Sequence, residues 1–317
     1  MTDLVTFGET MLRLTPPRGR RLEQVTEFDV AVGGAESNVA VAAAQFEHDV
    51  RWLSRLPDSP LGRRVSTELR RHGVEPAVDW TTGGRVGTYY LERGGKPRGA
   101  NVVYDRDRSA FDSVAVEDLP VDRLSGAKMF HTSGITPGLS DATAAATEHL
   151  LETAVDAGVR TSFDLNYRSK IWDPDAARET IEPLLSFVDV LFAPERDAAT
   201  VLGLEAEAPT QANRLANTYD VETVVVTRGT DGVVCRHDGE TFEQPIYETD
   251  TLDPVGTGDA FVGGFLATRL DGADCGDALA YAAATAALKR TIEGDMALVS
   301  PKEVEAVVES GGVDISR

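Results

Sequence analysis

Short apolar runs alternate with longer segments of helical character along most of this chain. The apolar runs are rich in β-branched side chains and predict buried strands at residues 4–7, 50–53, 128–133, 160–165, 190–193 and 223–227. The segments between and after them are alanine-rich or have an apolar face, and they predict helices at residues 35–46, 61–72, 141–157, 175–188, 197–203, 210–219, 260–270, 275–289 and 301–309. This alternation predicts an α/β fold in which a mostly parallel sheet has helices on both faces.

One region interrupts the alternation. Residues 86–92 and 101–106 alternate like strands, and the glycine-rich stretch 93–99 between them predicts a β-hairpin. Together with residues 10–30, the region 84–110 is expected to form a small β-lid, although residues 11–14 could also continue the first strand. A second hairpin is expected at 233–237 and 241–244. Because the sequence contains no repeat, low-complexity segment or linker, residues 1–317 are predicted to form one domain.

The composition is strongly acidic. The 317 residues carry a formal net charge of −21, which makes nucleic acids and anionic membranes poor partners. Five lysines against 26 arginines, with acids spread along the chain, resemble the surfaces of proteins from salt-accumulating microbes; an ordinary acidic cytosolic enzyme is the alternative. Two cysteines without a CxxC motif fit a reducing cytoplasm, and the first residues show neither a signal peptide nor a membrane span. The five histidines lack the spacing of a zinc site.

A loop near the C-terminus has the composition of an anion site. Residues 253–259 read Asp-Pro-Val-Gly-Thr-Gly-Asp and lead into a predicted helix. The N–H groups of Gly256, Thr257 and Gly258 would be free of helical partners there, and the helix dipole would add positive potential. Asp259 stands beside them, so it is a candidate base for a hydroxyl that attacks phosphorus. The alternative is that Asp259 only caps the helix.

Further polar groups are expected beyond the carboxyl ends of the strands, where ligands of open α/β sheets bind. The candidates are Gly34, Asn38, Tyr89 or Tyr90, Tyr104, Arg106 and Arg168. Tyr104 and Arg106 share one face of a lid strand, because they are two residues apart. Arginines together with tyrosine hydroxyls suit a ligand that bears a carboxylate. Each of these residues taken singly could instead be a solvated surface group.

Two segments carry a family resemblance. Residues 33–40 (Gly-Gly-Ala-Glu-Ser-Asn-Val-Ala) and 253–261 resemble the two signatures of the ribokinase-like (PfkB) sugar kinases, and the similarity extends over essentially the whole chain. Within that family, residues 33–38, 103–106 and 164–168 are similar to the 2-keto-3-deoxygluconate kinases, although fructokinases share parts of them. The resemblance implies a ribokinase-like three-layer sandwich with a small β-lid.

The resemblance also implies an activity. It is the phosphorylation of 2-keto-3-deoxygluconate at O6 by ATP with Mg²⁺, in sugar-acid catabolism of the Entner–Doudoroff type. The nearest alternative is the same chemistry on a neutral sugar such as fructose or ribose, and another is a non-catalytic sugar-acid sensor. The sequence does not separate the gluconate-derived acid from its galactonate-derived epimer.

Site roles follow from the resemblance residue by residue. Asp259 would be the catalytic base, and the amides of Gly256, Thr257 and Gly258 would form the anion hole. The sugar acid would be held by Gly34, Asn38, Tyr89, Tyr104, Arg106, Arg168 and Asp295. ATP would lie along Asn166, Thr227, Gly229 and Gly232. Asp253 matches a position that helps to bind a monovalent cation, such as K⁺, in some members of the family.

One segment departs from the family pattern. Where these kinases usually have Asn-x-x-Glu, with the Glu orienting magnesium-bound water, this chain has Pro194 and Asp197. Aspartate keeps the charge but is one methylene shorter, and Glu195 is an alternative candidate for the role. The lid hairpin also exposes a strand edge, which predicts a homo-oligomer formed through the lid.

Overall fold

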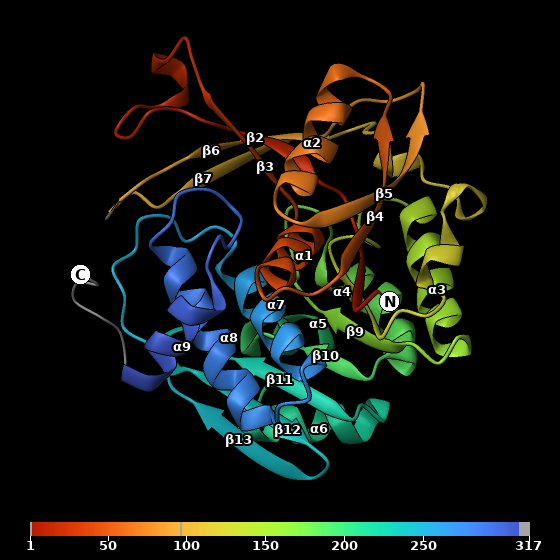
Figure 1. Cartoon of the computed structure of the whole chain (residues 1–317), viewed down its shortest axis with the longest axis vertical. Helices are drawn as coiled ribbons and strands as arrows, with labels where there is room; N and C mark the ends of the chain where they lie inside the picture. The colour runs from red at the N-terminus through yellow and green to blue at the C-terminus, as the bar shows by residue number, and fades with distance from the viewer. Residues whose placement is uncertain (1, 96, 311–317) are drawn as a thin grey trace.

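The computed structural model describes residues 2–95 and 97–310 and contains two β-sheets (Figure 1). Lys96, in the predicted hairpin turn 93–99, and the two ends of the predicted 1–317 domain lie outside the described residues. The larger sheet has nine strands and forms the body of the protein, and the smaller sheet has four strands and lies at the top of Figure 1.

The larger sheet has the strand order β13-β12-β11-β10-β9-β8-β1-β4-β5. Its strands are β1 (Leu4–Phe7), β4 (Val50–Pro57), β5 (Val74–Thr81), β8 (Met129–Ser133), β9 (Arg160–Asp164), β10 (Val190–Phe192), β11 (Thr223–Thr227), β12 (Val233–His237) and β13 (Glu240–Gln244). In this spatial order, the neighbouring strands β11, β10, β9, β8, β1, β4 and β5 all run parallel. Strands β12 and β13 add an antiparallel hairpin next to β11. The prediction of a mostly parallel central sheet is confirmed.

Helices cover both faces of this sheet (Figure 1). One layer contains α1 (Ala35–Gln45), α2 (Pro60–Arg71), α7 (Thr257–Leu270) and α8 (Cys275–Arg290), with α9 (Pro301–Ser310) packed on α8. The other contains α3 (Asp141–Asp156), α4 (Pro174–Leu184), α5 (Glu195–Leu202) and α6 (Ala208–Tyr219). Side chains along a strand alternate between the two hydrophobic cores: Val190 and Phe192 pack on the α7 side, and Leu191 on the α4 side. The result is the predicted three-layer sandwich.

The smaller sheet joins strands from the two predicted lid segments. Its order is β3-β2-β6-β7, with β2 (Met11–Thr15), β3 (Asp29–Gly33), β6 (Thr88–Glu92) and β7 (Asn101–Asp105). The prediction that residues 11–14 could continue the first strand is therefore wrong. Between β1 and β2 the chain leaves the larger sheet, and β2 pairs with β6 instead. Lys170 donates a hydrogen bond to the carbonyl of Val102 and so ties this lid sheet to the body.

Two strands, β5 and β3, were not predicted from the sequence. β5 contains Glu75, Pro76 and Asp79, which an edge strand tolerates since one side of its backbone is unpaired. β3 opens with the exposed Asp29. One boundary matters for the site: α7 begins at Thr257 rather than at residue 260, so Asp259 lies in its first turn.

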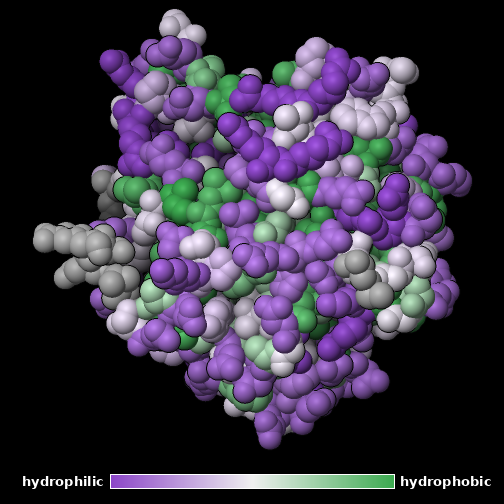
Figure 2. Space-filling model, in the orientation of Figure 1, coloured by the Kyte–Doolittle hydropathy of each residue, from purple (hydrophilic) through white to green (hydrophobic). Residues whose placement is uncertain are grey.

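The surface seen in Figure 2 is largely hydrophilic. Figure 2 shows hydrophilic side chains over most of one face, with hydrophobic ones gathered mainly beside the lid sheet. Within residues 2–95 and 97–310, every helix is too short or too polar to cross a membrane.

Candidate active site

A cavity of about 430 Å³ lies beneath the lid sheet, and we call it the central pocket. Its lining comes from the lid strands, the start of α1, the segments at the ends of β8, β9 and β10, residues 254–259, and Asp295. The residues predicted from the sequence that line it are Gly34, Asn38, Tyr89, Tyr104, Asn166, Arg168, Asp197, Gly256, Thr257, Gly258, Asp259 and Asp295. The fold thus brings together residues that are up to about 260 positions apart in the chain.

A second cavity, of about 240 Å³, lies between β12, the segment 244–247 and α8, and we call it the side pocket. Three predicted nucleotide contacts, Thr227, Gly229 and Gly232, line it. The fourth, Asn166, lines the central pocket instead. Thr257 and Gly258 line both pockets, so the first turn of α7 is the wall between them.

That wall is held in an unusual backbone conformation. Gly256 caps α7 with φ of 77°, in the left-handed region that favours glycine, and a Cβ there would overlap the carbonyl oxygen of Asp295. Beyond it, the amides of Gly258 and Asp259 belong to the first helical turn and so have no acceptor within the helix. The wall therefore offers N–H donors and the positive end of the α7 dipole to an anion.

Asp259 faces the central pocket from this first turn. The Asn38 side-chain amide donates to its Oδ2 at 2.6 Å. Burial raises the pKa of Asp259 to about 6, although Asn38 and the charge of Arg168 oppose the rise. A carboxylate with a pKa near neutrality can accept a proton and return it, as a general base requires. Asn38 Oδ1 is buried and accepts no hydrogen bond from any described residue, so it is available to a ligand.

Acidic groups gather on the β9 side of the pocket. Asp164 is buried, and its burial together with the charges of Asp259 and Asp197 raises its pKa to about 8. Asp197 accepts the Tyr167 N–H at 3.0 Å and is itself buried. Asp197 is also paired with Arg196 at 3.2 Å, and the two carboxylates supply oxygen ligands of the kind that a hard divalent cation such as Mg²⁺ prefers. The departure from Asn-x-x-Glu is thus compatible with a metal site, since Asp197 lines the pocket and Glu195 does not.

The predicted carboxylate-binding residues divide into two groups. Arg168 lines the central pocket, and the one hydrogen bond that its side chain makes to a described residue goes to the carbonyl of Tyr167 at 3.2 Å. Arg106 forms a buried ion pair with Glu9 and lies 5.8 Å from the ring centre of Tyr104, outside the pocket lining. Arg168 is therefore the better-placed cation for a ligand, whereas the role of Arg106 stays a prediction.

Asp295 and Tyr89 form one unit below the lid. The Tyr89 hydroxyl donates to Asp295, and Arg13 forms an ion pair with the same carboxylate at 3.1 Å. Gly33 leaves room for the Asp295 side chain, because a Cβ at Gly33 would overlap it. A Cβ at Gly34 would overlap the carbonyl oxygen of Glu9. Close packing against backbone and carboxylate explains why glycine occupies both positions.

Sequence reasoning missed Arg196, which lines the central pocket, and the buried Glu36, which does not. Arg196 lines the pocket next to Arg168 and is largely exposed, and its guanidinium donates to the Asp197 carboxylate at 3.2 Å. Glu36 is buried at the start of α1, where the Ser133 and Thr136 hydroxyls donate to it at 2.7 and 2.8 Å. A charged residue in the first turn of an otherwise apolar helix was the available signal for Glu36.

Comparison with known proteins identifies the family. Residues 1–302 match the model of the pfkB family of carbohydrate kinases. The chain belongs to the PfkB family. It is 55% identical over 315 residues to a 2-dehydro-3-deoxygalactonokinase from Haloferax volcanii, with 99% of each chain covered. It is 32% identical to a 2-dehydro-3-deoxygluconokinase from Thermoproteus tenax, covering 98% of this chain and 95% of that one.

Solved structures of PfkB kinases superpose closely on this one. The 2-dehydro-3-deoxygluconokinase from Thermotoga maritima matches with a TM-score of 0.92 and 36% identity, with 98% of each chain covered. A ribokinase II from E. coli solved with ATP and Mg²⁺ matches with a TM-score of 0.89 at 20% identity, covering 98% and 99%. The ribokinase-like fold is confirmed, and the protein is a carbohydrate kinase.

Proposed function

We propose that this kinase transfers the γ-phosphoryl group of ATP to the terminal hydroxyl, O6, of a 2-keto-3-deoxy sugar acid. One observation carries the proposal: the central and side pockets share the first turn of α7 as their common wall. A nucleotide in the side pocket and a sugar acid in the central pocket would therefore meet at free backbone N–H groups. Positioning of this kind is the main requirement of phosphoryl transfer.

The roles of the residues at that wall follow from their chemistry. Asp259 takes the proton of the attacking hydroxyl, and Asn38 holds its carboxylate in place. The amides of Gly256 and Gly258 stabilise the charge that develops on the transferred group, whereas the predicted contribution of the Thr257 amide is corrected, because its N–H donates to the carbonyl of Pro254 at 3.3 Å. Mg²⁺ held near Asp164 and Asp197 would neutralise phosphate charge when it is bound with ATP.

Arg168 supports an acidic rather than a neutral sugar. It lines the pocket and presents a guanidinium group that suits a carboxylate and that a neutral sugar would leave unused. The 2-keto-3-deoxy acids derived from gluconate and from galactonate differ in the configuration of one hydroxyl. We place the galactonate-derived acid first, because the relative with 55% identity carries that name, and the gluconate-derived acid second.

A coupled assay of the purified protein with ATP and Mg²⁺ tests the proposal. The substrates are the two epimeric acids, fructose and ribose, each measured at high and low KCl because the chain is so acidic. The two acids are expected to have the highest kcat/KM. Faster turnover of fructose would refute the sugar-acid assignment. If none of the substrates is turned over, the result would favour a non-catalytic sensor. Calorimetric titration of the protein with the two acids would then detect their binding.

The lid sheet also supports a proposal about assembly. Its outer strands β3 and β7 expose Val30 and Val103, whose side chains are 40% and 45% accessible. We propose that two copies associate through these lid strands in a cytoplasm of high salt. Light scattering of the wild type and of Val103→Glu checks this: the variant is expected to shift toward monomer, and an unchanged mass would contradict it.

A further inference from the structure

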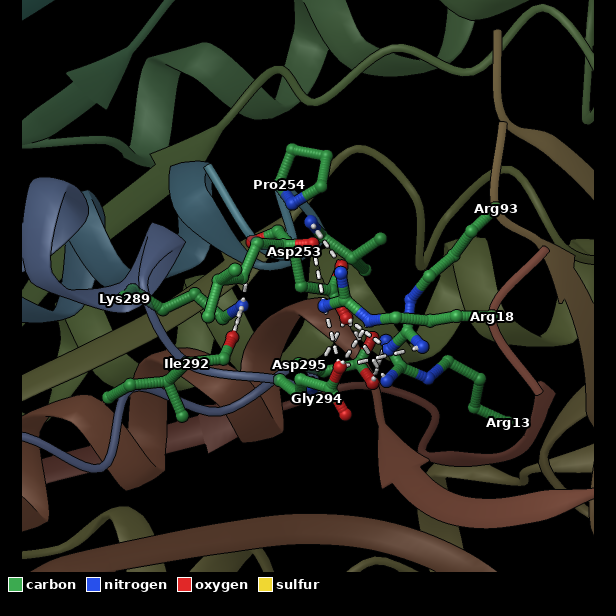
Figure 3. A network of polar contacts seen from close by, with 12 residues as sticks. Arg13, Arg18, Arg93, Asp253, Pro254, Lys289, Ile292, Gly294 and Asp295 are labelled. Carbon is green, nitrogen blue, oxygen red and sulfur yellow. Dashed lines mark hydrogen bonds and ion pairs between the residues drawn. The ribbon is translucent and has the colours of Figure 1, made fainter. Parts of the chain in front are cut away.

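The position expected to bind a monovalent cation is already filled by side chains of this protein (Figure 3). Asp253 is fully buried, and its Oδ2 accepts from Arg93 at 2.9 Å, from Arg13 at 3.3 Å and from the Gly294 N–H at 3.2 Å. Its Oδ1 accepts the Val255 N–H at 3.2 Å. Burial alone would raise the pKa of Asp253, but these donors hold it below its usual value. The carboxylate oxygens therefore do not fit a K⁺ ion.

The main-chain oxygens beside it are also occupied. Lys289 lies in the last turn of α8, and its side chain is completely buried. Its Nζ donates to the carbonyl of Asp253 at 3.2 Å and to the carbonyl of Ile292 at 3.2 Å. Bridging of main-chain carbonyls is what a bound monovalent cation would do there. Lysine is almost never buried without a counter-charge, and here Asp253 and Asp295 supply it.

The two segments that Lys289 joins both support the wall between the pockets. Asp253 begins the loop that leads to Gly256, and Ile292 begins the turn that leads to Asp295. Gly256 is packed against the carbonyl of Asp295, so a shift of either segment would move the N–H groups of the α7 first turn. Lys289 itself lines neither pocket.

We infer that Lys289 is a positioning residue for phosphoryl transfer, whose buried ammonium group takes the place of a monovalent cation and makes the enzyme independent of K⁺. The ammonium group acts through the two carbonyls and fixes the anion-hole loop against the 291–295 turn. Arg13 and Arg93 complete the arrangement by holding the Asp253 carboxylate. The inference rests on the proposed kinase reaction where kcat is measured. The thermal midpoint, its structural readout, needs no substrate.

The wild-type enzyme gives the first test. Activity and thermal midpoint are measured in KCl, NaCl and choline chloride at equal ionic strength, so that general screening of the acidic surface stays the same. We expect kcat to agree within about twofold among the three salts. A tenfold or greater stimulation by K⁺ over choline would overturn the inference without any variant.

Variants give the second test. Lys289→Met keeps most of the side-chain volume and removes the charge, and Lys289→Ala leaves space for a small cation. Both are expected to lower kcat at least tenfold and to change either KM less than threefold, because the loop amides act mainly on the transition state. Lys302→Ala, which removes an exposed lysine on α9, is the control and should match the wild type.

Rescue separates positioning from general stability. Ammonium or K⁺, but not choline, should restore part of the lost kcat of Lys289→Ala and raise its thermal midpoint. Unchanged kcat in both variants, or equal recovery in choline, would overturn the inference. If the variants do not fold, the wild-type salt series decides. If the wild type phosphorylates none of the substrates tested, the proposed function fails, while the salt dependence of the thermal midpoints still tests the role of Lys289.

Discussion

Replacement of Asp259 by asparagine should make the enzyme inactive and, at neutral pH, more stable. The two side chains have nearly the same shape, and the oxygen of the introduced amide could still accept the hydrogen bond from Asn38. The negative charge, however, is lost. If Asp259 is the base, kcat should fall by about 10²- to 10⁴-fold. For the wild type, kcat/KM should fall as the pH drops through about 6, because the base must be ionised to accept a proton.

The gain in stability can be estimated from the same carboxylate. Its pKa rises from 3.8 to about 6 on folding, and one pKa unit corresponds to 1.36 kcal/mol. Ionised Asp259 therefore destabilises the folded state by up to about 3 kcal/mol at pH 8. Because the folded pKa is the higher one, the penalty is nearly complete above about pH 7, shrinks as the pH falls through about 6, and is small at about pH 4. For a chain of this size, the variant should melt roughly 3 to 5 °C above the wild type at pH 8.

The assay is thermal unfolding of both proteins at pH 8 and at pH 4, at one KCl concentration, alongside steady-state kinetics. Asp250→Asn is the matched control, since it removes an exposed carboxylate six residues before the α7 cap and should shift neither midpoint by more than about 1 °C. An equal gain at both pH values would show that packing, not ionisation, is responsible. A kcat within tenfold of the wild type would refute the assignment of the base.

Three other substitutions test the pocket. Gly256→Ala adds a Cβ at a φ of 77° and against the Asp295 carbonyl, so it should lower kcat at least tenfold and the thermal midpoint by several degrees; normal kcat would argue against the loop amides as the anion hole. Arg168→Ala should raise KM for the keto-deoxy acids at least tenfold and KM for fructose less than twofold, whereas equal increases would mean that it does not contact the carboxylate. Arg106→Ala should raise KM for the acids less than Arg168→Ala does, because its guanidinium is paired with Glu9; the reverse order of KM values would contradict this.

Most strands and helices of the body could be predicted because their hydrophobic patterns are local, whereas β5 was missed because polar residues interrupt its pattern. The loop 253–259 was recognisable for the same reason, since glycines and carboxylates adjoin a helix start. The contact between Asn38 and Asp259 joins residues 221 positions apart, and local pattern carries no information about such a pair. The ion pair that removes Arg106 from the pocket lining and the burial of Lys289 at a helix end depend likewise on tertiary packing.

The path of the chain through the lid has a consequence for the use of ATP. Strand β3 ends at Gly33, Gly34 caps α1, and Asn38 near the start of α1 holds Asp259. A sugar acid that contacts Gly33 and Gly34 thus touches the segment that aligns the base. A water molecule in an otherwise empty pocket makes fewer of these contacts, so it is aligned less well as an acceptor. If the proposed reaction takes place, we expect this connection between lid and base to limit ATP hydrolysis when no sugar acid is bound.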